Sequence, residues 1–254
     1  MAYNKRQHLA DNIAALEFMF MRPEFCLTEE GRRVLNGYSG FGGLKCILNP
    51  AEKDTDIEKW TTDRELFPQV RLLHELLREY SKDETEYKAY VQSLKKSALT
   101  AFYTPEPLVA AMQESLQVSG SHPGRFLDPS AGTGMFISRL KDVPEIHCFE
   151  KDKLTGKILS SLYPESKVTI DGFQSIQPYY NSYFDMVSSN IPFGNTRVYD
   201  RDFDRSEDAV RKSSLGAVHN YFFLKGMDML REGGILAYIT TSGVMDSPGN
   251  RPIR

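Results

Sequence analysis

From residue 101 onward, short apolar runs alternate with stretches of helical pattern, and this alternation constrains the fold more than any other feature of the chain. The runs are nearly continuous in apolar residues, which is typical of strands buried on both faces. Strands that alternate with helices form a parallel sheet with helices on both faces and right-handed crossovers. The expected strands are 125–128, 145–150, 167–171, 183–188 and 234–240, and the expected helices between them are 135–140, 153–162 and 215–231.

The last expected helix has recognisable ends. Ser213 or Ser214 is placed to cap its first turn, because a serine side chain accepts a hydrogen bond from a free backbone N–H there. Gly233 and Gly234 follow its end, where glycine is common because it adopts the left-handed conformation. The sequence therefore predicts one continuous helix across residues 215–231.

The first hundred residues carry three helical stripes instead of alternating runs. The first stripe ends at Pro23, and a glycine-rich segment at 37–50, which we expect to be a loop, follows it. The sequence thus predicts a helical N-terminal extension, residues 1–98, followed by an α/β domain, residues 99–254. The stripes are Leu9, Ile13, Leu16 and Phe20; Leu66, Val70, Leu73, Leu77 and Tyr80; and Tyr87, Val91, Leu94 and Ala98.

The composition is that of an ordinary globular protein. Hydrophobic residues make up 41% and charged residues 26% of the 254 residues. No apolar run approaches the roughly 20 residues that span a bilayer, and the N-terminus lacks the apolar core of a signal peptide, so we expect a cytoplasmic protein with no membrane partner. Cys26, Cys46 and Cys148 form no C-x-x-C pair, which argues for a reducing compartment and against a metal site.

A glycine loop, DPSAGTGMF at 128–136, follows the first expected strand. Gly132 and Gly134 let the backbone turn tightly and approach a ligand closely. The dinucleotide pattern G-x-G-x-x-G is incomplete, because Ile137 stands at its third glycine, and the G-K-[ST] of a phosphate-binding P-loop is absent. Asp128 at the strand end favours a cationic or amine-bearing ligand over a pyrophosphate. A tight turn with no ligand is the alternative.

The next two strand ends carry acids. Glu150 is placed at the carboxyl end of the second strand, where an acid accepts hydrogen bonds from ribose hydroxyls in nucleotide-binding α/β folds. Asp171 follows the third strand and is placed to accept a hydrogen bond from an adenine amine, with Phe173 stacking on the ring. The alternatives are that Asp171 and Gly172 form a plain turn and that Phe173 is a core residue.

The glycine loop, Glu150 and Asp171, in this order and followed by SNIPFG at 189–194, resemble the class I S-adenosylmethionine-dependent methyltransferases. The segment AFYTPEPLVAAM at 101–112 resembles the one that precedes the first strand in adenine-N6 enzymes. The resemblance implies a Rossmann-like methyltransferase fold with S-adenosylmethionine as cofactor. The implied cofactor-binding residues are Tyr103, Thr104, Asp128, Pro129, Ser130, Ala131, Gly132, Thr133, Gly134, Glu150, Lys151, Asp171, Gly172, Phe173 and Asn190.

From about Tyr38 to the C-terminus the chain also resembles the methylase portion of large methylase–helicase polypeptides of mobile elements. This resemblance implies methylation of the N6 amine of adenine in DNA, with Asn190, Ile191, Pro192 and Phe193 as the catalytic tetrad. The usual tetrad is Asn-Pro-Pro-Phe, and members of this group often depart from it at the second letter.

The tetrad has a physical role in amine methylation. An adenine amine is a weak nucleophile because its lone pair is delocalised into the ring. Hydrogen bonds from N6 to the Asn190 side chain and to the backbone carbonyl of Ile191 would favour a nucleophilic nitrogen, and Phe193 would stack on the flipped base. Because the second acceptor is main chain, Ile191 replaces proline there, and we expect Ile191→Pro to be tolerated. No metal and no histidine base is required.

Three alternatives to an active DNA methylase stay open. These are a cofactor-binding module with weak or no activity in a larger nucleic-acid-processing protein, a methylase of RNA or of protein glutamine, and, more distantly, a nicotinamide oxidoreductase. The net charge of −3 lacks the basic footprint of a duplex-DNA binder. The resembled fold has seven strands, and the residues after 234–240 leave no room for the last two. We therefore expect the chain to be part of a longer polypeptide, with its C-terminal strands missing here, with DNA as partner and with C-terminal regions needed for DNA binding. The charged segment 197–214 is expected to be a solvated loop, with a lid over the target strand as the alternative.

Overall fold

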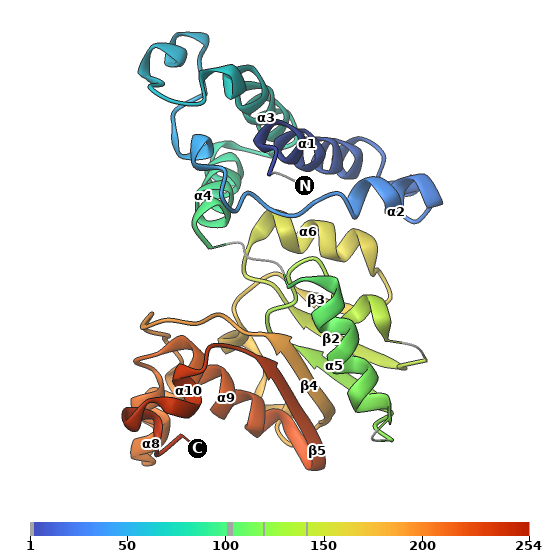
Figure 1. Cartoon of the computed structure of the whole chain (residues 1–254), viewed down its shortest axis with the longest axis vertical. Helices are drawn as coiled ribbons and strands as arrows, with labels where there is room; N and C mark the ends of the chain where they lie inside the picture. The colour runs from blue at the N-terminus through green and yellow to red at the C-terminus, as the bar shows by residue number, and fades with distance from the viewer. Residues whose placement is uncertain (1–2, 101–103, 119, 141, 254) are drawn as a thin grey trace. The chain divides into compact units, whose positions relative to one another are not determined.

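The structure, a computed structural model, describes residues 3–100, 104–118, 120–140 and 142–253. Packing divides the chain into two compact units (Figure 1). The helical unit consists of residues 1–103 together with 152–164, and the α/β unit consists of residues 104–151 together with 165–254. The chain therefore enters the helical unit a second time after its N-terminal helices are complete.

The helical unit is built on the stripes that the sequence shows. Each stripe lies on a helix and packs into one core, in which Leu9, Leu16 and Leu73 are fully buried. Asn4 caps the first helix by accepting a hydrogen bond from Gln7 N, and the helix ends just before Pro23, as predicted. The helices are α1 Lys5–Met21, α2 Glu29–Leu35, α3 Phe67–Glu79, α4 Glu84–Thr100 and α6 Lys153–Leu162.

Helix α6 has the bounds that the sequence predicts, but it packs with the N-terminal helices. Its apolar residues Leu154, Ile158 and Leu162 lie in the core of the helical unit. Asp152 caps its first turn through Thr155 N, and the Ser93 hydroxyl of α4 donates to the same carboxylate at 2.5 Å. The expected division into residues 1–98 and 99–254 stays a proposal. Helix α6 lies between β2 and β3 in the sequence but packs in the core of the helical unit.

The α/β unit contains a sheet of five parallel strands, in the order β3-β2-β1-β4-β5. The expected fold class is therefore confirmed. The strands are β1 Arg125–Asp128, β2 Glu145–Phe149, β3 Lys167–Thr169, β4 Phe184–Asn190 and β5 Leu230–Ile239. The helices of this unit are α5 Glu106–Val118, α7 Arg201–Arg205, α8 Ala209–Ser214, α9 Val218–Met229 and α10 Gly243–Asp246.

The two faces of the sheet carry separate hydrophobic clusters, as alternating side chains in a strand require. Phe126 and Met186 lie in a cluster with Val109 of α5. Leu127 and Val187 lie in the other cluster, which includes residues of α9. Figure 1 shows both helices beside the strands. The apolar strands read from the sequence thus form a sheet with helices on both faces, in which β1 and β4 are mostly buried and the outer strands β3 and β5 are exposed or half-buried.

Two of the expected helices differ from the structure. The run 135–140 forms only a short 3-10 helix, Ile137–Arg139, because six residues after a glycine turn give too few hydrogen bonds for a stable α-helix. The run 215–231 is a helix only from Val218 to Met229, with Ala217 as N-cap, so the predicted Ser213 or Ser214 cap is wrong. The helix ends early because Leu230 already pairs with Phe184, which places Gly233 and Gly234 within β5.

The charged segment 197–214 also differs from the expected loop. It contains α7 and α8, and Phe203 of α7 is buried in the α9 cluster. Asp200 and Asp208 supply the N-caps of these two helices. Asp200 and Asp208 therefore have structural partners, which the alternation of charge in the sequence does not reveal.

Candidate active site

The glycine loop and the predicted catalytic tetrad meet at one edge of the sheet. Strands β1 and β4 are parallel neighbours, with Leu127 paired to Val187, so both end at the same edge. The Ser189 hydroxyl, one residue before Asn190, donates to the backbone carbonyl of Ser130 in the glycine loop at 3.4 Å. The two motifs that the sequence separates by about sixty residues are thus side by side.

The glycine loop has the backbone geometry that its glycines permit. Gly132 and Gly134 have φ of 56° and 89°, in the left-handed region that favours glycine. Gly132 N donates to the Glu150 carboxylate at 2.8 Å, and Ala131 N donates to the Phe149 carbonyl at 2.9 Å. Glu150 therefore lies beside the loop, as predicted, and its carboxylate also stabilises the loop by accepting this backbone hydrogen bond. Thr133 is half-buried, and Pro129 is buried.

Asp128 is the most unusual residue of this edge. Its side chain is fully buried, and Oδ1 accepts a hydrogen bond from Ser130 N at 3.1 Å. Within the part of the chain that the structure describes, Oδ2 has no hydrogen-bond partner. Burial raises the pKa of this carboxyl to about 7, against weaker lowering effects of the nearby Ser189 hydroxyl and of the hydrogen bond from Ser130 N. A buried carboxylate oxygen without a partner fits a cationic ligand.

Of the two predicted residues after the third strand, Asp171 lies at the surface and Phe173 lies in the core. Asp171 is exposed, and its carboxylate accepts a hydrogen bond from Gly172 N at 2.6 Å. Phe173 is 1% exposed and packs against Phe149 and Phe222, with ring centroids at 5.9 and 5.3 Å. The core alternative describes Phe173 in this structure, because its ring presents no free face. Its stacking on a cofactor stays a prediction.

The remaining predicted cofactor residues lie in three environments. Lys151 is exposed directly after Glu150. Thr104 is buried and precedes α5, which begins at Glu106. Tyr103 lies outside the described residues. The structure therefore brings together Asp128, the glycine loop and Glu150 with the tetrad.

The tetrad has one buried and two exposed members after Asn190. Asn190 is the last residue of β4. Ile191 is buried, and its N–H donates to the Ile239 carbonyl of β5 at 3.1 Å. Pro192 is exposed, and Phe193 is 56% exposed, so its ring is accessible from solvent; its stacking on a base stays a prediction. A proline at 191 would remove the N–H donor, so the expectation that Ile191→Pro is tolerated does not fit this geometry.

Helix α9 contacts the chain directly after the tetrad. Gly194, at φ 117°, donates its N–H to His219 Nδ1 and accepts from Val218 N, both at 3.3 Å. Burial lowers the pKa of His219, which favours the neutral imidazole that this acceptor role requires. Sequence reasoning missed His219, because its partner is a backbone amide twenty-five residues away.

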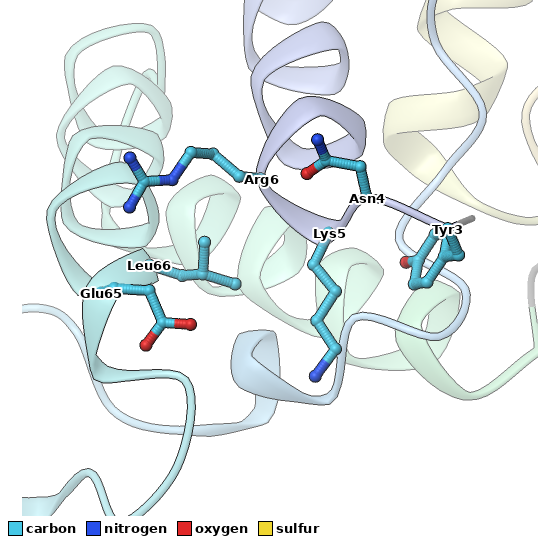
Figure 2. Close-up of a pocket in the computed structure, with 6 residues that line it drawn as sticks. All are labelled: Tyr3, Asn4, Lys5, Arg6, Glu65 and Leu66. Carbon is cyan, nitrogen blue, oxygen red and sulfur yellow. The ribbon is translucent and has the colours of Figure 1, made fainter. Parts of the chain in front are cut away.

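A concavity lies in the helical unit, at the start of α1 (Figure 2). Its volume is about 450 Å³, and Lys5 at its lining pairs with Asp63 at 2.8 Å. None of the predicted cofactor or tetrad residues lines it, so we do not assign the predicted chemistry there. The lining residues are Tyr3, Asn4, Lys5, Arg6, Glu65 and Leu66.

The described residues lack two kinds of feature. No cluster of three or more His, Cys, Asp or Glu side chains suited to a metal ion occurs among them. None of the helices formed by these residues has the length and apolar character to cross a membrane.

The chain is similar in sequence to a phage defense protein and to a known methyltransferase. No protein-family model matches it. It is 28% identical over 163 residues to Defense against restriction protein B of Escherichia phage P1, and 27% identical over 161 residues to the type II methyltransferase M.XamI of Xanthomonas campestris pv. amaranthicola. These matches cover 62% and 58% of this chain but only 7% and 30% of the two relatives, so the chain spans less than a third of either.

The fold has solved counterparts. The methyltransferase subunit of a type I restriction-modification system from Streptococcus thermophilus matches with a TM-score of 0.50 and 14% identity. The match covers 98% of this chain and 70% of that subunit. At this identity the likeness shows the fold alone. It confirms the class I methyltransferase fold that the resemblance implies, and the sequence matches confirm the resemblance to methylases.

Proposed function

Because the chain has the class I methyltransferase fold and resembles methylases in sequence, we propose that it binds S-adenosylmethionine and methylates the N6 amine of adenine in DNA. One observation carries the proposal. The Asn190 loop and the glycine loop lie at one sheet edge, on neighbouring strands β4 and β1, with Ser189 bonded to Ser130. A cofactor and a target amine would therefore be held next to each other.

The residues around the glycine loop fit the proposed cofactor. S-adenosylmethionine carries two positive groups, an ammonium and a sulfonium, and supplies an electrophilic methyl group when bound. Asp128 offers a buried carboxylate oxygen with no partner among the described residues, which a cation would satisfy. Gly132 and Gly134 leave the backbone of the loop open to close approach.

The residues of the tetrad fit the proposed target. The amide oxygen of Asn190 would accept one hydrogen bond from the N6 amine, and the carbonyl of Ile191 would accept the other. Phe193 presents an exposed ring on which a flipped adenine would stack. These groups bind and orient the amine, and methyl transfer itself then needs no side chain that forms a covalent intermediate.

We expect Asn190→Ala to lower the rate of methyl transfer by at least about a hundredfold, because it removes an acceptor that the amine needs in the transition state. Its affinity for S-adenosylmethionine should stay within about threefold of the wild type. Incubation with labelled cofactor and DNA, followed by mass spectrometry for N6-methyladenine, measures the rate, and calorimetry measures the affinity. Asn195→Ala, at an exposed position after the loop, is the matched control.

The same assay separates the alternatives. The intact parent protein should be assayed beside this chain, with DNA, RNA and protein as substrates. Labelled RNA or glutamine with unlabelled DNA would refute DNA as the target. Cofactor binding without transfer to any polymer, by both proteins, would favour the inactive module.

A further inference from the structure

A buried ionic cluster lies directly downstream of the tetrad. The Asp200 carboxylate accepts a hydrogen bond from the Tyr221 hydroxyl at 2.7 Å and pairs with Lys225 Nζ at 3.2 Å. Its other oxygen accepts from Asp202 N and Phe203 N at the start of α7. The side chains of Lys225 and Asp200 are only 7% and 4% exposed. Although burial alone raises the pKa of Asp200, the hydrogen bonds from Tyr221 and Phe203 N, with Lys225, hold it below its ordinary value.

The cluster belongs to the helix that also holds the tetrad loop. Tyr221 and Lys225 lie on α9, whose first residues Val218 and His219 bond Gly194. The segment between Gly194 and Asp200 is therefore tied to one helix at both of its ends. Asn190 and Ile191 are in turn fixed to β5 by strand pairing and by the Ile191–Ile239 hydrogen bond.

A cluster of this kind fixes the geometry of the groups around it more than it adds to the stability of the fold. Taking a carboxylate and an ammonium out of water costs about as much as their attraction returns, so an apolar pair of the same volume would often be as stable. The hydrogen bonds of an ionic cluster, in contrast, are satisfied only in one arrangement. Such a cluster is therefore suited to fixing a loop whose position decides a rate, because small misplacements of reacting groups cost large factors.

We propose that Asp200, Tyr221 and Lys225 are positioning residues that hold the Asn190–Phe193 loop in its working geometry through α9. This inference rests on the proposed function for its kinetic consequence but not for its structural one. Loss of the cluster should loosen the segment from Phe193 to Asp200 and misplace the Phe193 ring, while Asn190 and Ile191 stay paired with β5 and the glycine loop and Glu150 stay as they are.

The test compares two double variants in the full chain. Tyr221→Phe/Lys225→Met removes two partners of Asp200 and nearly preserves side-chain volume. The control is Tyr183→Phe/Lys167→Met, because Glu145 accepts from Tyr183 and Lys167, both at 2.7 Å. That cluster has the same chemistry but lies at the start of β2 and β3, at the opposite edge of the sheet.

We expect the α9 double variant to lower kcat by about ten- to a hundredfold, with the dissociation constant for S-adenosylmethionine within about twofold of the wild type. Amide hydrogen exchange at Gly194 should become at least about tenfold faster, while exchange at Ile191, which is bonded to β5, should stay unchanged. The control double variant should change neither quantity. Tyr221→Phe alone, which deletes one hydroxyl, gives the same readouts with a smaller effect if the double variant does not fold.

The outcomes separate this inference from the proposed function. Wild-type kcat together with unchanged exchange at Gly194 in the α9 variants would overturn the inference. If neither the wild-type chain nor the intact parent protein transfers a methyl group, the proposed function fails, and hydrogen exchange alone decides. Faster exchange in the α9 variants then supports the positioning role, and unchanged exchange overturns it.

Discussion

The buried carboxyl of Asp128 links the stability of the ligand-free protein to pH. Its pKa is about 7 in the folded chain and about 3.9 in an unfolded one. The folded state therefore binds the proton more tightly. Stability falls as the pH rises from about 4 to about 7 and stays lowered above that.

We predict that Asp128→Asn raises the free energy of unfolding at pH 8, without ligand, by an amount on the order of a few kcal/mol. At pH 4 the difference from the wild type should nearly vanish, because both side chains are then neutral. The same variant should bind S-adenosylmethionine more weakly, since the positive groups of the cofactor lose the Asp128 carboxylate as their negative partner. Urea unfolding at the two pH values and calorimetry measure these effects. Equal stability differences at pH 4 and pH 8 would contradict the pKa argument.

At the scale of an element, α9 packs closely on β5 through a glycine. A Cβ built on Gly226 would lie 2.3 Å from the Tyr238 hydroxyl and 3.0 Å from Leu236 Cδ1. Tyr238 has little room to move, because its ring also packs edge-on against Phe223. The glycine therefore allows the helix to approach the strand, despite its cost within a helix.

We predict that Gly226→Ala destabilises the chain by roughly 1–3 kcal/mol, although alanine has the higher helix propensity. Gly249→Ala is the control, because the nearest atom to its built Cβ, Ser247 Oγ, lies at 3.8 Å. Thermal and urea unfolding of the two variants measure the difference. A more stable Gly226→Ala would show that β5 adjusts without cost.

Elements with strong local signals were predictable from the sequence. Strand β1 and helix α6 have the predicted bounds, because an apolar run or a 3.6-residue stripe with an N-cap defines each locally. The C-terminal limit of α9 was not predictable, since Leu230 leaves the helix only because it pairs with Phe184.

Within the site, the glycine loop, Glu150 and Asn190 were found because each follows a recognisable strand. Asp200 and His219 were not found from the sequence. Asp200 pairs with Lys225 and Tyr221, and His219 bonds Gly194, and no short-range pattern in the sequence connects these partners. The burial of Phe173 likewise depends on Phe222, far along the chain.

At the scale of the whole molecule, the stability of residues 104–254 depends on the N-terminal helices, because α6 packs against them. Its residues Leu154, Ile158 and Leu162 are buried among the N-terminal helices.

We predict that residues 104–254 expressed alone unfold at least about 10 °C below the full chain or aggregate, because Leu154, Ile158 and Leu162 lose their apolar surroundings. Calorimetric melting of both proteins measures this. Ile158→Ser in the shortened protein is the control and should partly restore solubility. A shortened protein with the melting temperature of the full chain would refute the dependence.

The path of the chain between the two units also constrains how such a protein is inherited. The boundary is crossed three times, after residues 103, 151 and 164. A single recombination event between genes exchanges everything on one side of a junction. An exchange within codons 104–151 would thus combine the N-terminal helices of one parent with the α6 of another, and their core would be mismatched. We therefore expect the two units to descend together, as one block, and to vary in sequence in a correlated manner at the α4 and α6 positions.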